Sequence, residues 1–344
     1  MKILVTGGCG YIGAHTIIDL LDKGYEVVCI DNLSRSKSFV PDRIREVAGK
    51  DFTQFRIDLR DLPKLRTVLH DHQDIQGIIH FAAFKSVSES TRIPLIYYDN
   101  NLNANINILR IADEYQIKHF ILSSSCSVYG NVQELPVKED TPMSMPESPY
   151  GWTKLLSEEM IRAHAPNTET KCIALRYFNP VGAHPGGMIG EIPFSTPENL
   201  VPNITRTAIG LQDAITVHGT DYPTRDGSCV RDYVHVMDIA EAHRLALEYS
   251  MRKVDTDTRT MEVFNLGSGT GISVLELIHA FERVSDMRLS YTLGPRREGD
   301  VVAIYADNTK AKEVLGWECS RNIDDMMSTA WKWEQQMQKE GLSG

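Results

Sequence analysis

The chain opens with Met1-Lys2-Ile3-Leu4-Val5-Thr6-Gly7-Gly8-Cys9-Gly10-Tyr11-Ile12-Gly13, and this stretch decides the fold. An apolar run over residues 3–6 leads directly into three spaced glycines and then into an amphipathic pattern over residues 12–23. Glycines at these places let the backbone turn tightly, approach a pyrophosphate and pack a helix on a strand, while the helix N-terminus faces the phosphates. A tight structural turn is the alternative explanation of the glycines alone.

A second apolar run, residues 27–30, ends in Asp31, eighteen residues after Gly13. A carboxylate at this place accepts hydrogen bonds from an adenosine ribose and repels the 2′-phosphate of NADP. The sequence therefore predicts dinucleotide binding with NAD as the cofactor. Arg35 is a departure from the simplest NAD case, since it is close enough in sequence to tolerate a 2′-phosphate.

Further apolar runs alternate with amphipathic patterns through the first two thirds of the chain. Because runs that are apolar on both faces indicate a parallel sheet covered on both sides, we predict an α/β fold. It consists of a doubly wound parallel-sheet Rossmann domain with a smaller, interleaved C-terminal substrate-binding α/β domain. The predicted strands are residues 3–6, 27–30, 54–57, 77–81, 119–123, 172–175 and 263–266, and the predicted helices are 12–23, 62–70, 101–115, 150–163, 201–210, 237–250, 274–284, 310–315 and 323–338.

Proline and glycine crowd the chain from about Phe178 onward, which marks a linker or a binding region. We predict an NAD-binding domain over residues 1–178, with contributions from about 232–266, and a substrate domain over 179–344.

The charge balance limits the partners. Thirty-six Lys and Arg against 46 Asp and Glu give a net charge of −10 without a block of like charge. We therefore expect no binding of nucleic acid or membranes, and an anionic ligand must be met locally. No apolar stretch reaches the roughly 20 residues that cross a bilayer. The six cysteines stand singly, which indicates reduced thiols, no metal site and a cytoplasmic location.

Tyr150 and Lys154 are four residues apart, so a helix stacks them on one face. Ser148-Pro149 just before them is typical of a helix start. A neighbouring ammonium and a positive nicotinamide ring both favour the phenolate of a tyrosine, whose ordinary pKa is about 10. Tyr150 is therefore a candidate to take a proton from an alcohol while hydride leaves the same carbon. An exposed helix face is the alternative for the pair.

A serine-rich run, residues 123–130, follows the predicted strand 119–123. Open α/β sheets bind ligands at the carboxyl ends of their strands, so Ser125 is placed to bond a reacting hydroxyl or the phenol. A plain turn is the alternative. The residues alone indicate an alcohol-oxidising, NAD-binding enzyme.

Longer motifs carry a resemblance. The sequence resembles the extended short-chain dehydrogenase/reductases and, among them, is similar to the UDP-glucose 4-epimerase family along nearly its whole length. The matching segments are residues 7–13, 31–34, 97–101, 123–130, 148–154, 176–184, 231–236 and 296–300. Segments 7–13 and 148–154 are common to the superfamily, whereas 176–184 and 296–300 are more particular to the epimerases.

The resemblance implies an isomerase of galactose metabolism that reversibly interconverts UDP-glucose and UDP-galactose. Hydride leaves C4 of the sugar, a 4-keto intermediate turns over, and hydride returns to its other face, while NAD stays tightly bound. Tyr150 is implied as the acid/base, Lys154 as the group that holds the nicotinamide ribose and tunes Tyr150, and Ser125 as the assisting hydroxyl.

The resemblance also implies two sets of binding residues and no metal ligand. The cofactor set is Gly7, Gly10, Tyr11, Ile12, Gly13, Asp31, Asn32, Ser34, Ser36, Asp58, Leu59, Phe81, Ala82, Ala83, Lys85, Asn100, Ser123, Tyr150, Lys154, Tyr177 and Phe178. The substrate set is Lys85, Ser125, Cys126, Ser127, Tyr150, Tyr177, Phe178, Asn179, Asn199, Leu200, Thr216, Val217, His218, Arg231, Tyr233, Arg297 and Asp300.

Arg231 and Arg297 are the candidates to hold the diphosphate, because guanidinium meets phosphate bidentately. Their acidic neighbours Asp232, Glu298 and Asp300 leave structural ion pairs open as the alternative.

Some positions depart from the epimerase pattern. His218 replaces an aromatic ring expected beside the uracil, and Ala104-Asn105 and Trp152 differ without removing a chemical group. Ile304 is intermediate between the bulky Tyr that accompanies strict glucose/galactose use and the small residue that accompanies N-acetylated sugars. We therefore expect efficient use of UDP-glucose and UDP-galactose and weaker activity on UDP-N-acetylhexosamines.

Three alternatives to this function remain. A 4,6-dehydratase needs an Asp-Glu pair beside the active serine or threonine, where this chain has Cys126-Ser127. Another NAD-dependent 4-epimerase, acting on UDP-GlcNAc or a UDP-pentose, is separated by a substrate panel. A non-catalytic NAD-binding sensor is the third. A homodimer is expected because helices 101–115 and 150–163 resemble those that pair in the family's dimers; burial against the sheet is the alternative.

Overall fold

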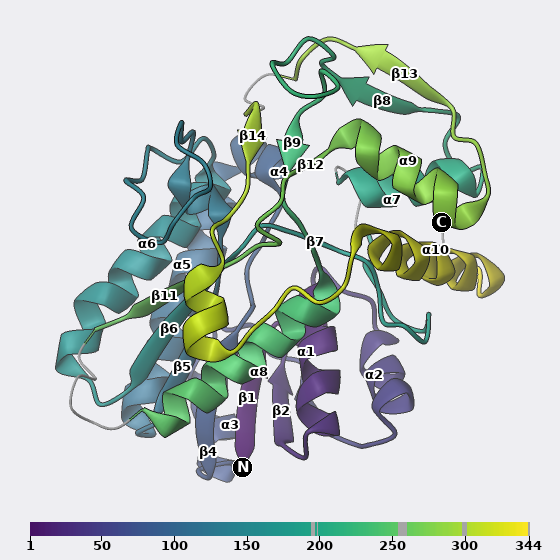
Figure 1. The fold of residues 1–344 in the computed structure, drawn as a ribbon. Helices are drawn as coiled ribbons and strands as arrows, with labels where there is room; N and C mark the ends of the chain where they lie inside the picture. The colour runs from purple at the N-terminus through teal and green to yellow at the C-terminus, as the bar shows by residue number, and fades with distance from the viewer. Residues whose placement is uncertain (194–196, 198, 254–259, 298–300, 343–344) are drawn as a thin grey trace.

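A computed structural model describes residues 1–193, 197, 199–253, 260–297 and 301–342. Its centre is a seven-stranded parallel sheet in the order β11-β6-β5-β4-β1-β2-β3 (Figure 1). The strands are β1 (Lys2–Thr6), β2 (Glu26–Ile30), β3 (Thr53–Phe55), β4 (Ile75–His80), β5 (His119–Ser125), β6 (Lys171–Tyr177) and β11 (Glu262–Leu266). The chain first winds outward from β1 to β3 and then in the other direction from β4, so the switch point lies at the carboxyl end of β1. The predicted fold class is confirmed.

Helices cover both faces of this sheet, because alternate side chains of each central strand enter two separate cores. Ile3 and Val5 lie in the core under α1, α2 and α8, whereas Leu4 lies in the core under α3, α5 and α6. The helices are α1 (Tyr11–Asp22), α2 (Val40–Ala48), α8 (Val236–Arg252), α3 (Leu62–Asp71), α5 (Pro94–Glu114) and α6 (Pro149–His164). Within the described ranges, no helix is long and apolar enough to span a membrane.

A smaller lobe follows β6 and lies at the upper right of Figure 1. Its helices α7 (Leu200–Ala208), α9 (Val274–Ser285) and α10 (Ile323–Lys339) share one apolar core. Three small sheets accompany these helices. They pair β7 (Asn179–Val181) with β10 (Tyr233–His235), β8 (Ile215–His218) with β13 (Tyr291–Gly294), and β9 (Val230–Arg231) with both β12 (Ile272–Ser273) and β14 (Ala303–Ile304).

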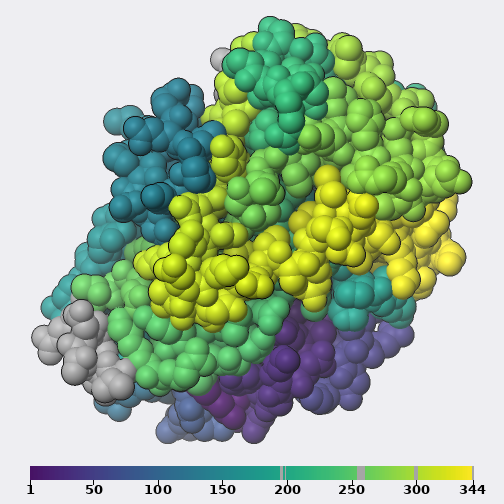
Figure 2. Space-filling model, in the orientation of Figure 1, coloured from purple at the N-terminus to yellow at the C-terminus, as the bar shows by residue number. Residues whose placement is uncertain are grey.

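Two segments tie the lobes together. The Val137 N–H donates to the Tyr305 carbonyl at 2.8 Å, and the Val137 carbonyl accepts from the Asp307 N–H at 2.7 Å. Further along, the C-terminal segment crosses α8 on the front of the molecule, in yellow in Figure 2. There the Trp317 indole N–H donates to the Asp238 carbonyl at 2.7 Å. These contacts join segments that are far apart in the sequence.

Every strand and helix predicted from the sequence has a counterpart, but their extents differ. Helix α5 begins at Pro94, earlier than the predicted start at 101, and the segment 310–315 forms a single π-type turn, Ala311–Leu315. The sequence did not predict α2, the six-residue α4 (Val87–Arg92) or the short strands β7–β10 and β12–β14. Apart from α2, which has nine residues, these elements have two to six residues, too few to show a periodicity.

Candidate active site

The glycines of the phosphate loop stand where no side chain fits. Gly7 has a φ of +68°, and its N–H donates to the Ile30 carbonyl at 2.8 Å. A Cβ on Gly7 would lie 2.6 Å from the Ala82 nitrogen, and a Cβ on Gly13 would lie 2.5 Å from the Gly7 carbonyl oxygen. Because Gly10 has no side chain to cap α1, the first N–H groups of the helix face outward for an anion.

Asp31 is fastened beside this loop. Its carboxylate accepts the Cys9 N–H at 3.0 Å and the Leu33 N–H at 2.8 Å, and burial raises its pKa. The Ser36 hydroxyl lies 3.5 Å away, and the Ser34 N–H donates to the Asn32 side chain at 3.0 Å. The structure therefore gathers these predicted cofactor residues at the carboxyl ends of β1 and β2.

Asp58 joins the same group through Asn32, whose side-chain amide donates to it at 3.1 Å. Hydrogen bonds from Arg60 hold the pKa of Asp58 down at about 2, so this carboxylate is charged at neutral pH. The neighbouring Leu59 is buried, and its carbonyl accepts from the Asn107 side chain at 2.9 Å.

Arg35 has its own partner. Its guanidinium donates to Glu89 at 2.9 Å and lies 4.5 Å from the centre of the Phe84 ring. The charge of Arg35 is therefore paired at α4.

The end of β4 lies across the loop from these groups. The Phe81 N–H donates to the Thr6 carbonyl at 3.0 Å, and the ring stacks on His243 at 4.5 Å between centres. Ala82 and Ala83 follow with small side chains, beside Gly7. A small cavity between the phosphate loop and residues 189–192 is lined by Gly10, Tyr11, Ser36, Ile189 and Gly190 among others.

Glu191 connects two residues that sequence reasoning treated separately. It accepts from Lys85 at 2.8 Å and from the Asn199 side chain at 3.1 Å. Lys85 is 61% exposed, so it lies at the mouth of the site. Sequence reasoning missed Glu191, because neither contact leaves a local pattern.

The proposed catalytic groups are buried together. Helix α6 starts where Ser148-Pro149 predicted, with the Ser148 hydroxyl accepting the Gly151 N–H at 3.1 Å. Tyr150 is 7% exposed and Lys154 is 5% exposed, so the exposed-face alternative is wrong. Lys154 Nζ donates to the Ser123 carbonyl at 2.7 Å.

Ser125 completes this group from the end of β5. Its hydroxyl accepts the Ser127 N–H at 3.2 Å and lies close enough to the Tyr150 phenol to influence its pKa. Burial raises the pKa of the phenol well above its usual value, and Ser125 lowers it only in part. Burial lowers the pKa of Lys154 to about 8. The ammonium is held by a carbonyl, and Tyr150 is a neutral acid in the field of the protein alone.

Asn101 clamps the cofactor side to the catalytic helix. It accepts the Phe84 N–H at 2.8 Å and donates to the Thr153 hydroxyl at 2.9 Å. Asn100, the residue proposed from the sequence to support the cofactor, donates to Asn101 at 3.0 Å. Sequence reasoning missed the role of Asn101, although both residues lie in the matching segment 97–101.

Aromatic and apolar side chains form the wall beyond Tyr150. The Tyr177 hydroxyl lies 2.8 Å from the Ser123 hydroxyl, and burial raises the pKa of Tyr177 to about 12. Phe178, Cys126 and Ile304 belong to one apolar cluster. The structure therefore brings the specificity position Ile304 to the site.

Other proposed substrate residues are more spread out. The Asn179 side chain donates to the Asp232 carbonyl at 3.1 Å, and Tyr233 is buried in the core of the small lobe. Leu200 opens α7, and Thr216, Val217 and His218 lie on β8, where Val217 is fully buried. Arg297 is exposed just after β13, and Glu298 and Asp300 lie outside the described residues.

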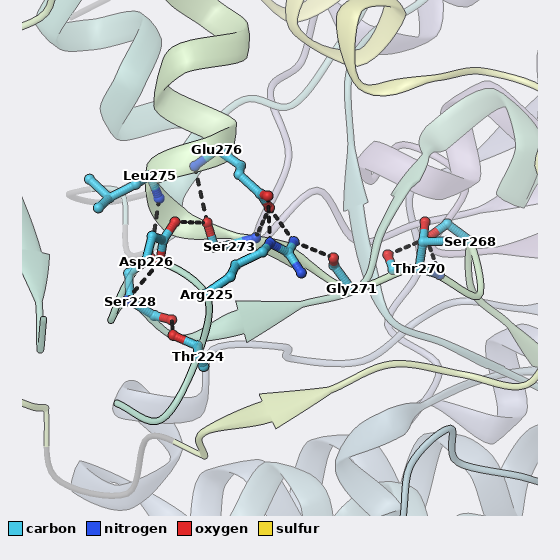
Figure 3. Close-up of polar contacts among 10 residues, drawn as sticks. All are labelled: Thr224, Arg225, Asp226, Ser228, Ser268, Thr270, Gly271, Ser273, Leu275 and Glu276. Atoms are coloured by element: carbon cyan, nitrogen blue, oxygen red, sulfur yellow. Dashed lines mark hydrogen bonds and ion pairs between the residues drawn. The ribbon is translucent and has the colours of Figure 1, made fainter. Parts of the chain in front are cut away.

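The Arg231 side chain is held by two backbone carbonyls. Its guanidinium Nη1 donates to the Val230 carbonyl at 2.9 Å and the Val301 carbonyl at 2.8 Å. The preceding loop is fastened to the start of α9, as Figure 3 shows: Arg225 pairs with Glu276, and Asp226 bonds Ser273 and Ser228. These contacts, which sequence reasoning missed, fix the loop that leads into β9.

A dinucleotide-type phosphate loop and a buried Ser-Tyr-Lys group at one sheet edge define an extended short-chain dehydrogenase/reductase. The family model described as GDP-mannose 4,6 dehydratase matches residues 4–330. Curated relatives are the UDP-glucose 4-epimerases of Erwinia amylovora, 46% identical over 98% of each chain, and of Bacillus subtilis, 44% identical over 97% of each. The chain belongs to the UDP-glucose 4-epimerase family.

Solved structures agree. The UDP-glucose-4-epimerase from Stenotrophomonas maltophila with bound NAD and formylated UDP-arabinopyranose has a TM-score of 0.94 at 42% identity and covers 99% of each chain. That from Bifidobacterium longum in complex with NAD+ and UDP has a TM-score of 0.92 at 39% identity over the full length of both.

Proposed function

We propose that this chain is a UDP-glucose 4-epimerase that reversibly interconverts UDP-glucose and UDP-galactose with tightly bound NAD. The observation that carries the proposal is the buried group of Ser125, Tyr150 and Lys154 beside the phosphate loop, in a chain of this family.

The residues present fit NAD. The loop from Gly7 to Gly13 forms a cradle that a Cβ would fill, and Asp31 offers carboxylate oxygens at the end of β2. Lys154 would hold the nicotinamide ribose, and Asn100, Phe81 and Tyr177 would border the rings. When bound, NAD supplies the hydride acceptor and donor and a positive charge beside Tyr150.

The chain itself handles the proton. Tyr150 takes the proton of the sugar C4 hydroxyl and returns it after the 4-keto intermediate has turned its other face. Ser125, which lowers the pKa of the phenol, would donate to or accept from the sugar hydroxyl. The Ser123 carbonyl fixes the position of the Lys154 ammonium. Because the ammonium is buried in a low dielectric, its electrostatic effect on the reacting groups is strengthened.

The substrate diphosphate is assigned to Arg231 and Arg297, and the sugar pocket to Phe178, Asn179 and Asn199. The uracil is assigned to the edge formed by Thr216–His218, where the His218 ring replaces the usual aromatic. The packing of Ile304 against Phe178 supports the preference for UDP-glucose and UDP-galactose over N-acetylated sugars.

The Cys126 thiol supports epimerisation over 4,6-dehydration, although the matching family model carries a dehydratase name. Elimination needs an acid/base pair beside the active serine, and burial raises the pKa of Cys126 to about 12, which keeps this thiol neutral.

We also propose a homodimer formed through α5 and α6. Both helices bury one face on the sheet, yet their outer faces carry apolar side chains that are exposed or half-exposed: Leu95, Ile96, Leu102, Ile106, Trp152, Leu156 and Met160. Sedimentation of Leu95→Arg tests this, with Leu293→Arg, at a similarly exposed leucine of β13, as the control. A dimeric Leu95→Arg chain would contradict this interface. Galactose metabolism in the cytoplasm is the setting we propose, consistent with six free cysteines.

The decisive experiment incubates the purified chain with UDP-galactose and follows UDP-glucose by chromatography. We expect interconversion by the wild type and a loss of about 10²-fold or more in Tyr150→Phe, as removal of a general acid/base gives. Tyr115→Phe, at an exposed helix end, is the matched control. No product from the wild type, or a 6-deoxy product, would overturn the proposal, and parallel assays with UDP-GlcNAc and a UDP-pentose identify another 4-epimerase.

A further inference from the structure

A buried ion pair lies one helical turn beyond Lys154. Glu158 on α6 and Arg176 on β6 have side chains 0% and 1% exposed, and the guanidinium meets the carboxylate twice, at 2.6 and 3.0 Å. Replacing such a pair by apolar residues is often neutral or stabilising, so stability alone does not account for it.

Glu158 also reaches the strand that carries the site. Its carboxylate accepts from the Ser124 hydroxyl at 2.5 Å. Ser124 stands between Ser123, whose carbonyl accepts from Lys154 at 2.7 Å, and Ser125, whose hydroxyl lowers the pKa of the Tyr150 phenol. Because successive strand side chains point to opposite faces, Ser124 faces α6 when its neighbours face the other side. Glu158 therefore fixes the middle of a tripeptide whose two ends contact both catalytic groups.

Arg176 extends the same unit. Its Nη1 donates to the Tyr129 hydroxyl at 2.9 Å, and that hydroxyl donates to Asn265 on β11 at 2.7 Å. The ion pair thus joins α6, β5, β6, β11 and the turn after Ser125 into one hydrogen-bonded body.

The charge of Glu158 acts on Lys154. Burial lowers the pKa of this lysine to about 8, and Glu158 opposes the shift. Two further titratable groups interact with the ammonium, His80 from β4 and His243 from α8. Tyr150 lies one turn before Lys154 on α6, and Tyr177 from β6 contacts the Ser123 hydroxyl. Burial puts the pKa values of the histidines at about 3 and about 4 and that of Tyr177 at about 12, and it raises the pKa of Tyr150. Lys154 is therefore the member of this group that changes charge near pH 8.

We propose that Glu158 is a positioning residue of the epimerisation: with Arg176 and Ser124 it holds Tyr150 and Lys154 against β5 and keeps the ammonium charged. This inference rests on the proposed function.

The test compares kcat, KM and the pH profile of Glu158→Gln with those of the wild type. We expect kcat to fall about 10²-fold, as a misplacement of about 1 Å gives, with KM nearly unchanged. The alkaline limb of kcat should move to lower pH, because the amide no longer supports the ammonium and Arg176 is left unpaired. Glu158→Asp keeps the charge, so its limb should stay in place although kcat falls.

Asp19→Asn is the matched control. It breaks the Asp19–Arg244 pair, whose side chains are 14% and 8% exposed and which joins α1 to α8 on the other face of the sheet. We expect a lower melting temperature with an unmoved pH profile. Should Glu158→Gln not fold, Ser124→Ala removes one tie without unpairing a charge, and it should lower kcat and leave the limb in place.

Two results overturn the inference. In the first, Glu158→Gln has the kcat of the wild type and the same alkaline limb of the pH profile. In the second, its kcat falls by no more than the fraction of the variant that is unfolded. A wild type that fails to interconvert the sugars refutes the proposed function instead. The inference is then decided by carbon-13 NMR of labelled lysines, with Lys154→Arg identifying the resonance. Lys154 should lose its proton at lower pH in Glu158→Gln, and an unchanged titration contradicts the inference.

Discussion

Two regions of the molecule differ in how their charged side chains are surrounded. The first is the catalytic edge of the large sheet, with Lys154, Glu158 and Arg176. The second is the arginine rim of the small lobe, with Arg296 and Arg297. At the edge, Lys154, Glu158 and Arg176 are almost fully buried, and each has a protein partner at hydrogen-bond distance. At the rim, Arg296 and Arg297 are exposed to water, and Arg296 bonds the exposed Asp221 at 2.8 Å. Charges in a dry site act strongly and need no reorganisation, whereas exposed charges are screened by salt. The edge is thus ordered by the protein itself, whereas we propose that the substrate diphosphate completes the rim.

The largest effect at the catalytic edge is expected from the substitution Gly13→Ala. The new Cβ would lie 2.5 Å from the Gly7 oxygen and 2.8 Å from the Gly8 Cα, both of them backbone atoms that cannot swing away. We expect loss of bound NAD and of activity, measured as the dinucleotide content of the purified chain. Gly210→Ala, at φ +80° with open space around it, is the control for backbone strain and should keep its NAD. Wild-type NAD content in Gly13→Ala would contradict the cradle.

Acid should lower the free energy of unfolding of the large-sheet lobe, because its buried histidines are neutral in the folded chain. Burial lowers the pKa values of His15 and His243 to about 4 and that of His80 to about 3. The unfolded chain binds these protons at about pH 6.5 and the folded chain does not, so stability is full above that pH and falls as the pH drops toward 4. Each histidine should cost about 2 kcal/mol at pH 5.

Thermal melting between pH 7.5 and 4.5 measures this loss. His243→Phe, which keeps a ring beside Phe81, should make the dependence shallower. A melting temperature that stays constant across this range would show that the histidines are protonated in the folded chain.

The rim is tested by Arg297→Ala. Because an exposed guanidinium binds the diphosphate equally in the ground and transition states, KM should rise about tenfold with kcat unchanged. Arg296→Ala is the matched control, since its guanidinium already bonds Asp221 at 2.8 Å and lies 4.3 Å from the Tyr222 ring centre. Equal effects of the two substitutions would remove Arg297 from the diphosphate site.

The smallest effect is expected where edge and rim meet, at Ile304. It is 8% exposed and shares a cluster with Phe178 and Cys126. Ile304→Ala should raise the ratio of kcat/KM for UDP-GlcNAc to that for UDP-glucose about fivefold, which corresponds to the lower end of the discrimination of about 1–3 kcal/mol that a single methylene gives. Ile304→Val should give a smaller rise. Equal efficiency of the wild type on both sugars would refute the predicted ranking.

The edge was predictable from the sequence because its groups have fixed spacings within single elements. Gly7 to Gly13 span one turn, Asp31 ends one strand, and Tyr150 and Lys154 occupy one helix face. Each of these relations is local, so the chain itself sets the geometry.

What the sequence could not predict are contacts between distant segments. Glu158 meets Arg176, Glu191 meets Lys85 and Asn199, and Asn101 meets Thr153 across helices. The rim is carried by strands of two to four residues, which show no periodicity. Tyr233, proposed as a substrate residue, lies in the apolar core of the small lobe. All three residues of β10 are buried, so the sequence of this short strand does not show which of its side chains face the site.

The place of β11 in the chain has a consequence for synthesis on the ribosome. This strand completes the sheet beside β6, but the whole of residues 178–261 separates the two. When β6 has left the ribosome and β11 has not, β6 therefore has an unpaired edge. Such an edge can pair with strands of other chains. Until β11 has left the exit tunnel, that edge stays open to pairing with a strand of another chain.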